Sequence, residues 1–269
     1  MCDERQDLVV AQLAPEEAHP RARAAAERAL DLDPDLAEAH VSLATVLFDY
    51  YREREKAEEH YRRALSLDPA YAKGRQLYAE FLRDLERFDE AFEQIDEAIR
   101  LDPLSPYHRL VRGIILHMAR RDDEALAIYD RLLEATPGFR IVHLYRAMAL
   151  SAAGRNREAL TALDLADPDG KIPDTHAIRA VALAGVGLLD EARKQLDRLG
   201  VLGPGQTLPF HEAIVRVALG EHDRAVELLE QDVDRRTWFS RLIAVAPVLD
   251  PVREHAGFQE LRRRVARPS

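Results

Sequence analysis

The chain has 269 residues, more than one hydrophobic core usually serves, so two domains or an extended array are expected. Its residues are 47% hydrophobic and 32% charged, and Ala, Leu, Arg and Glu, which all favour helices, predominate, so the composition predicts a folded all-α protein. A net charge of −10 repels phosphate groups and argues against a nucleic-acid partner.

Cysteine usage and the N-terminus bear on the cellular compartment. Cys2 is the single cysteine, which excludes a disulfide framework and fits a reducing compartment. The first residues are acidic and lack the apolar core of a signal peptide, and no run approaches the length of a membrane span. We therefore expect a cytoplasmic protein that has no membrane partner.

Residues 1–36 are predicted to form a degenerate first repeat or cap. Ala22, Ala26 and Ala29 have the spacing of one helix face, and Pro34 follows where that helix should end. Residues 3–13 are the candidate partner helix of this unit.

From residue 37 onward two columns of small residues recur in register. The second column has successive spacings of 34, 34, 34, 33 and 33 residues, and its members are Ala57, Ala91, Ala125, Ala159, Ala192 and Ala225. The first column lies 12 residues upstream, or 13 in the first unit, and its members are Ala44, Ala79, Gly113, Ala147, Ala180 and Ala213. Two helices approach closely only where side chains are small, so each column is predicted to mark a helix crossing.

Helix-ending and turn-forming residues between the columns predict one helix pair per unit. Leu-Asp-Pro tripeptides end the early units, because proline lacks the amide donor and disfavours helix in the residue before it. Gly154, Gly187 and Gly220 lie between paired helices, where a left-handed residue would turn the chain. The six predicted units are 37–71, 72–105, 106–139, 140–172, 173–205 and 206–236.

This pattern resembles the tetratricopeptide repeat family, whose 34-residue unit has a small residue followed by an aromatic one and then proline. The clearest unit is 72–105. The resemblance implies an all-α solenoid, a right-handed superhelix of antiparallel helix pairs that binds other proteins. The chain departs from the family at its tryptophan position, which is occupied by His40, Arg75, Arg109, His143, His176 and Pro209.

Residues 237–269 are predicted to cap the array with a helix that turns Phe258 and Leu261 inward. The sequence of this segment resembles the closing segment of tetratricopeptide domains in bacterial winged-helix regulators and signalling proteins. That resemblance implies a regulatory or sensor domain as an alternative to a free-standing interaction module.

No motif for catalysis, a cofactor or a metal is found. The glycines at 200–205 lack the Gly-Lys-Ser/Thr ending of a phosphate loop, and no helical His pair has metal-ligand spacing. We therefore predict no catalytic residue, no cofactor, no metal site and no enzyme activity.

The family resemblance places the first helix of each unit on the concave surface, where it predicts a groove for a partner helix or peptide. The stripe of candidate groove residues is charged in the second unit and largely apolar from the third, and consists of Lys73, Glu80, Arg83, Tyr107, Leu110, Ile114, Met118, Leu144, Met148, Phe210 and Ile214. So much exposed apolar surface is unusual for a monomer. Two interpretations remain open: a partner covers the stripe, or the superhelix buries it against itself. The first interpretation predicts substantial exposure in the unliganded protein.

Overall fold

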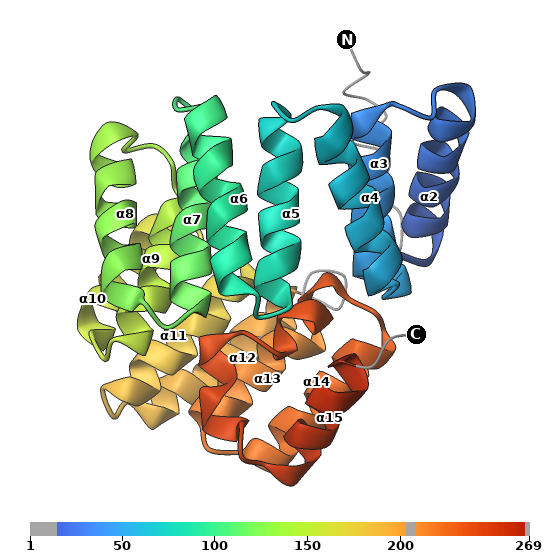
Figure 1. Ribbon diagram of the computed structural model, residues 1–269. Coiled ribbons are helices and arrows are strands. Elements are labelled where there is room, and N and C mark those ends of the chain that lie inside the picture. The colour runs from blue at the N-terminus through green and yellow to red at the C-terminus, as the bar shows by residue number, and fades with distance from the viewer. Residues whose placement is uncertain (1–14, 203–207, 267–269) are drawn as a thin grey trace.

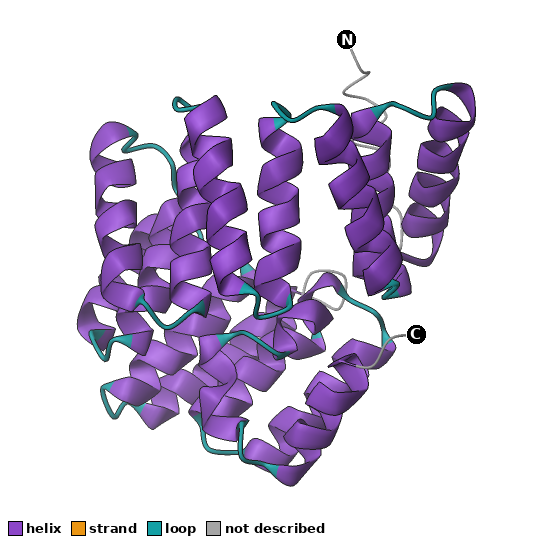
Figure 2. Cartoon of the chain, in the orientation of Figure 1, coloured by secondary structure: helices purple, strands orange, loops and turns teal. Residues whose placement is uncertain are grey.

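The computed structural model describes residues 15–202 and 208–266, and over these two ranges every regular element is helical (Figure 1). Figure 2 shows the helices joined by short loops. The proposed helix at residues 3–13 lies outside the described residues. The elements are α2 (Pro15–Leu32), α3 (Ala37–Val46), the π-helical turn η1 (Leu47–Tyr51), α4 (Arg54–Leu67), α5 (Ala72–Asp84), α6 (Phe88–Leu101), α7 (Pro106–Met118), α8 (Asp122–Ala135), α9 (Ile141–Ala152), α10 (Asn156–Ala166), α11 (Pro173–Gly185), α12 (Leu189–Leu202), α13 (Pro209–Ala218), α14 (His222–Asp234), the 3-10 segments η2 (Trp238–Ile243) and η3 (Pro247–Val252), and α15 (Ala256–Ala266).

From α3 to α14 the helices form consecutive antiparallel pairs, and the first helix of each pair also contacts the first helix of the next. The two small-residue columns lie at these crossings. Every alanine in both columns has no exposed surface, which confirms their predicted role. Gly113 faces the fully buried ring of Tyr129, and a Cβ atom at position 113 would lie 2.4 Å from Tyr129 Cε1. The solenoid is therefore held by close backbone approach at one place in each helix.

The first unit carries one extra residue between its helices. The structure absorbs it in η1, where the chain makes a single π-helical turn before α4 begins. A π-helical turn is how an α-helix accommodates an inserted residue. This turn moves Asp49 and Tyr50 toward the C-terminal segment, where both make contacts.

Each of the six units turns between its helices through one left-handed residue. Three turns use glycine, as expected, with φ of 75°, 82° and 74° at Gly154, Gly187 and Gly220. The first three units have φ of 59°, 60° and 61° at the equivalent positions, Arg52, Glu86 and Arg120. A side chain there is strained, because its Cβ atom crowds the backbone. This arrangement calls for a compensating contact.

All three non-glycine turn residues contact the C-terminal part of the chain. The Arg52 guanidinium donates to the Val233 carbonyl at 2.6 Å, and the Glu86 carboxylate lies 3.3 Å from Arg262. The Arg120 guanidinium donates at 2.6 Å to the Val245 carbonyl and to the carboxylate of Asp250. The strained turns therefore contact three C-terminal elements: Arg52 binds α14, Glu86 lies beside α15, and Arg120 binds residues 245 and 250 between them.

The first unit closes against the end of the array. Arg54 donates to the carbonyls of Val265 and Ala266 at 2.5 and 3.1 Å, and Arg236 donates to the Tyr50 carbonyl at 3.3 Å. Arg236 also has a left-handed backbone, with φ of 51°. In Figure 1 the C-terminal elements (red) lie directly below the N-terminal helices (blue to teal). The expectation of an extended array is therefore wrong, because the superhelix curves until its first unit contacts α14, η2 and α15.

Candidate functional site

The C-terminal segment 237–252 covers the concave face. As expected, Phe258 and Leu261 of α15 are buried in a capping helix, but the residues before it run back across the inner helices. The Phe239 ring stacks on Phe210, with centroids 4.6 Å apart, and meets His211 edge-on at 5.0 Å. The η3 turn packs on α9 and α13. The chain thus supplies its own cover for the surface where a groove was predicted.

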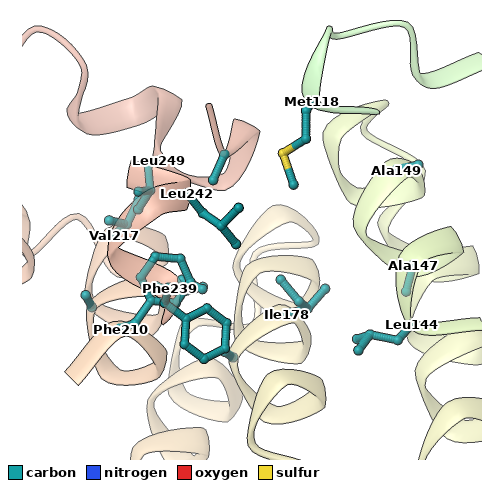
Figure 3. Packing of buried hydrophobic residues seen from close by; sticks show 14 of the residues in the cluster. Met118, Leu144, Ala147, Ala149, Ile178, Phe210, Val217, Phe239, Leu242 and Leu249 are labelled. Carbon is teal, nitrogen blue, oxygen red and sulfur yellow. The ribbon is translucent and has the colours of Figure 1, made fainter. Parts of the chain in front are cut away.

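A cavity of about 280 Å³ remains between the inner helices and this cover. Figure 3 shows Leu144 and Ile178 directed into the space from the inner helices, with Phe239 and Leu242 opposite and Met118 at its edge. The walls come from α5, α7, α9, α11 and α13 on one side and from residues 239–248 on the other. Apolar side chains form most of the lining.

The cavity brings together most of the residues predicted from the sequence. Eight of them line it: Glu80, Arg83, Ile114, Met118, Leu144, Met148, Phe210 and Ile214. The other three lie elsewhere. Lys73 is exposed at the start of α5, Leu110 is part of the core, and Tyr107 is exposed with its ring edge-on to Phe139 at 4.9 Å. Eight of the eleven predicted residues, from the second unit to the sixth, therefore line one cavity, and Lys73, Tyr107 and Leu110 lie outside it.

The expected exposure of the apolar stripe is wrong. Leu110, Ile114, Met118 and Leu144 are only 4%, 7%, 3% and 6% exposed, and Met148 is half-buried. Burial follows because the C-terminal segment packs on the inner helices and removes apolar surface that a monomer rarely leaves in water. The second interpretation, burial of the superhelix against itself, is the correct one for these side chains, apart from the space left by the cavity.

Sequence reasoning missed several wall residues. Tyr145 and Ile178 each lie two positions before the first-column alanine of their unit and so point inward beside the stripe that was considered. Their shared position relative to that alanine could have predicted that both line the concave face. Phe239, Arg241 and Leu242 carried no such signal, because they lie in an irregular segment without helical periodicity.

One end of the cavity is bounded by a buried cluster of ion pairs. Arg83 Nε donates to Asp84 Oδ1 at 2.7 Å, and Arg241 lies 2.6 Å from an Asp49 carboxylate oxygen and 3.2 Å from Asp84 Oδ2. Burial raises the pKa of Asp84, and the neighbouring arginines oppose that rise. Burial lowers the pKa of Arg241, but the carboxylates of Asp84 and Asp49 outweigh it and raise the pKa overall. The two cations and two anions of this cluster neutralise one another.

Two further carboxylates line the cavity outside this cluster. Glu80 accepts a hydrogen bond from Gln76 Nε2 at 2.9 Å, and Asp174 lies 3.6 Å from His211 Nε2. Within the described ranges, neither forms an ion pair with lysine or arginine. Burial raises the pKa of Tyr145, a wall residue that also responds to Glu80 and Asp174. The cavity is therefore apolar with an excess of negative charge.

A larger, shallower depression of about 540 Å³ lies on the outer face between α6, α7 and α8. Its walls include Ile99, Ile128 and the side chains of Arg109, Arg112 and Arg131. It is another place where a partner could bind.

Residues 15–202 and 208–266 contain no group of three or more His, Cys, Asp or Glu side chains that could bind a metal ion. Nor do they contain a helix with the length and apolarity needed to cross a bilayer.

Comparison with known proteins places this architecture. The family described as tetratricopeptide repeat matches residues 50–106 and 79–138. The type IV pilus assembly protein PilF of Pseudomonas aeruginosa is 37% identical over 77 residues, which are 29% of this chain and 30% of PilF. The match thus spans less than a third of that relative's length.

Solved structures extend the likeness along the chain. PilW, described as a widely conserved type IV pilus biogenesis factor, has a TM-score of 0.61 and 24% identity over 73% of this chain and 91% of its own. A tetratricopeptide repeat protein from Parabacteroides merdae has a TM-score of 0.62 and 13% identity over 98% of both chains. At these identities the likeness shows the fold alone.

The resemblance of the C-terminal segment to winged-helix regulators finds no support in these matches. The repeat family and the fold, by contrast, agree with the helix pairs, the small-residue crossings and the left-handed turns. Residues 50–138 therefore match the tetratricopeptide repeat family, and the chain as a whole has the fold of a tetratricopeptide repeat solenoid.

Proposed function

We propose that the chain is a non-catalytic protein-interaction module that receives a segment of a partner protein in its inner cavity. The observation that carries this proposal is the apolar space of about 280 Å³ left between the inner helices and the C-terminal segment. Interiors are ordinarily packed with few voids larger than a water molecule. An apolar space of this size beside the inner helices can receive side chains of a partner.

The size of the cavity favours a protein partner over a small molecule. Pockets for drug-sized ligands usually have roughly 300–1,000 Å³, and this cavity of about 280 Å³ is smaller than that range. One or two apolar side chains anchored in a desolvated pocket supply much of the affinity of many protein interfaces. Such an anchor fits a cavity whose walls are Leu144, Ile178, Phe239 and similar residues.

Filling the cavity without removing core contacts tests this proposal. Ile178→Phe adds volume inside the cavity, while Ile128→Phe makes the same change in the outer depression and serves as the matched control. Both proteins and the wild type would be immobilised and exposed to a lysate of the source organism, and captured proteins identified by mass spectrometry. Melting temperatures would check that both variants fold.

The expected result is a protein captured by the wild type and by Ile128→Phe but lost with Ile178→Phe. Photo-crosslinking from Met148, a wall residue, should then join that protein to the cavity. Loss of capture with Ile128→Phe alone would place the partner on the outer face and refute the proposal.

A further inference from the structure

We infer that the partner segment presents a positively charged side chain beside its apolar anchor, and that Glu80 and Asp174 bind that charge. The inference rests on the proposed function, because it assigns a chemical class to the occupant of the same cavity. It is carried by the distribution of charge around the cavity rather than by its shape.

The cations at the cavity are already engaged. Arg83 is bonded to Asp84 at 2.7 Å, and Arg241 is paired with Asp49 at 2.6 Å and with Asp84 at 3.2 Å. Asp84 has no exposed side-chain surface and Arg83 has 5%, so water does not replace these partners. An anionic ligand at either arginine would therefore meet the repulsion of carboxylates that already neutralise the guanidinium charge.

Glu80 forms no ion pair with lysine or arginine within the described residues, and it interacts with the already paired Arg241 only over a longer distance. Its one hydrogen bond comes from the neutral amide of Gln76, at 2.9 Å. The carboxylate is half-buried and lines the cavity. A cation placed against it would gain a charge-assisted hydrogen bond, which is stronger than a bond between neutral groups.

Asp174 also forms no ion pair with lysine or arginine within the described residues. Its neighbour His211 accepts the backbone N–H of Leu208 on Nδ1 at 3.0 Å, which places the proton of the neutral ring on Nε2. That nitrogen lies 3.6 Å from Asp174, too far for a hydrogen bond, and has no bonding partner within the described residues. The neutral ring therefore orients toward the carboxylate without balancing its charge.

The apolar walls strengthen the effect of both carboxylates. Electrostatic interactions weaken as the dielectric constant rises, so charges beside an apolar cavity act more strongly than on an open surface. The net charge of −10 for the whole chain also attracts a basic partner during encounter. Shape, local charge and overall charge thus favour one ligand chemistry, an apolar group next to an ammonium or guanidinium.

Methionine methyl NMR gives a direct test. The chain has three methionines, and two of them, Met118 and Met148, line the cavity. Protein labelled with ¹³C at the methionine methyl groups would be titrated with 3-phenylpropylammonium, 3-phenylpropanol and 3-phenylpropionate, which share one apolar body and differ in charge. Met118→Leu and Met148→Leu assign the two signals.

We expect the cation to shift both signals and to bind roughly tenfold more tightly than the anion, a ratio that corresponds to about 1.4 kcal/mol. The double variant Glu80→Gln/Asp174→Asn should remove most of that preference while the neutral probe binds as before. The exposed pair Glu93→Gln/Asp123→Asn makes the same change in net charge away from the cavity and should leave the preference intact.

The outcomes separate the two proposals. Equal binding of the three probes, or tighter binding of the anion, would overturn the inference about charge and leave the cavity as a binding site. Absence of any shift at Met118 and Met148 with all three probes would overturn both.

Discussion

Replacing Arg120 with glycine tests whether side chains at strained turns hold the C-terminal segment. The change relieves a left-handed backbone, φ of 61°, which costs a non-glycine residue roughly 1–2 kcal/mol. It also removes the 2.6 Å hydrogen bond to the Val245 carbonyl and the ion pair with Asp250. A hydrogen bond from a charged group contributes roughly 1.5–3 kcal/mol, and the half-exposed ion pair adds at most about 1 kcal/mol. Arg120→Gly should therefore destabilise the protein by about 1–2 kcal/mol in spite of the relieved strain.

Two companion variants separate strain from contact. Arg120→Ala loses the contacts and keeps the strained backbone, so it should be less stable than Arg120→Gly by roughly 1–2 kcal/mol. Gly154→Ala introduces the same strain at the equivalent turn of the fourth unit, where an added Cβ would meet no atom within 4 Å. Its cost should match the difference between the two Arg120 variants.

Urea unfolding followed by circular dichroism gives the three free energies, and hydrogen exchange of residues 237–252 reports on the segment itself. Both Arg120 variants should speed exchange there, and Gly154→Ala should not. If Arg120→Gly is as stable as the wild type or more so, the contacts contribute less than the strain costs. The reasoning about these turns would then be refuted.

Three further perturbations follow from the packing and the histidines. Gly113→Ala would bring a Cβ atom to 2.4 Å from the buried Tyr129 ring and should destabilise the fold by about 1–2 kcal/mol after the gain in helix propensity. The double variant Gly113→Ala/Tyr129→Ile should lose less stability than its two single changes lose together. Additive losses in urea unfolding would show that the two residues do not clash. His60 Nδ1 lies 2.8 Å from His40 Nδ1, and the pKa of His60 is lowered chiefly by burial and further by the charge of His40. The stability that neutral His60 contributes is therefore fully present above the unfolded pKa of 6.5 and is lost as the pH falls through the lower folded pKa. The wild type should therefore lose its advantage over His60→Gln between pH 7.5 and 5, and a constant advantage in thermal melts would contradict this. Ala91→Leu, at a fully buried crossing, should cost roughly 1–3 kcal/mol by overpacking, and an unchanged unfolding midpoint would show that the crossing lies elsewhere.

The repeat was readable from the sequence because one physical requirement recurs at a fixed interval. A crossing needs a small residue: the side chain of Ala91 is fully buried, and at Gly113 even a Cβ atom would meet the ring of Tyr129. The inward stripe followed from the same register. Most of the predicted stripe residues line the cavity. Tyr145 and Ile178 were not predicted because the stripe did not include the position two residues before each first-column alanine.

The cover over the concave face could not be read in this way. Its short 3-10 turns have no periodicity, and its contacts join residues far apart in the chain, 125 positions for Arg120 and Val245 and 192 positions for Asp49 and Arg241. The left-handed turns that contact the C-terminal elements could not be predicted either. Such a turn is normally recognised by its glycine, and here the residue is Arg52, Glu86 or Arg120. Arginine and glutamate at such positions look like ordinary surface residues.

Closure of the superhelix has a consequence for how the protein folds. In an open solenoid, stability is a sum of terms between neighbours, and folding can begin at any unit and spread along the chain. Bonds such as those from Arg54 to residues 211 and 212 positions away add contacts that form only after the intervening units are in place. Long-range contacts of this kind slow folding, since the entropy of closing the loop precedes the gain. Refolding should therefore show a fast phase in which helix pairs assemble and a slower one in which the ends join, and Arg54→Ala should retard the second phase alone.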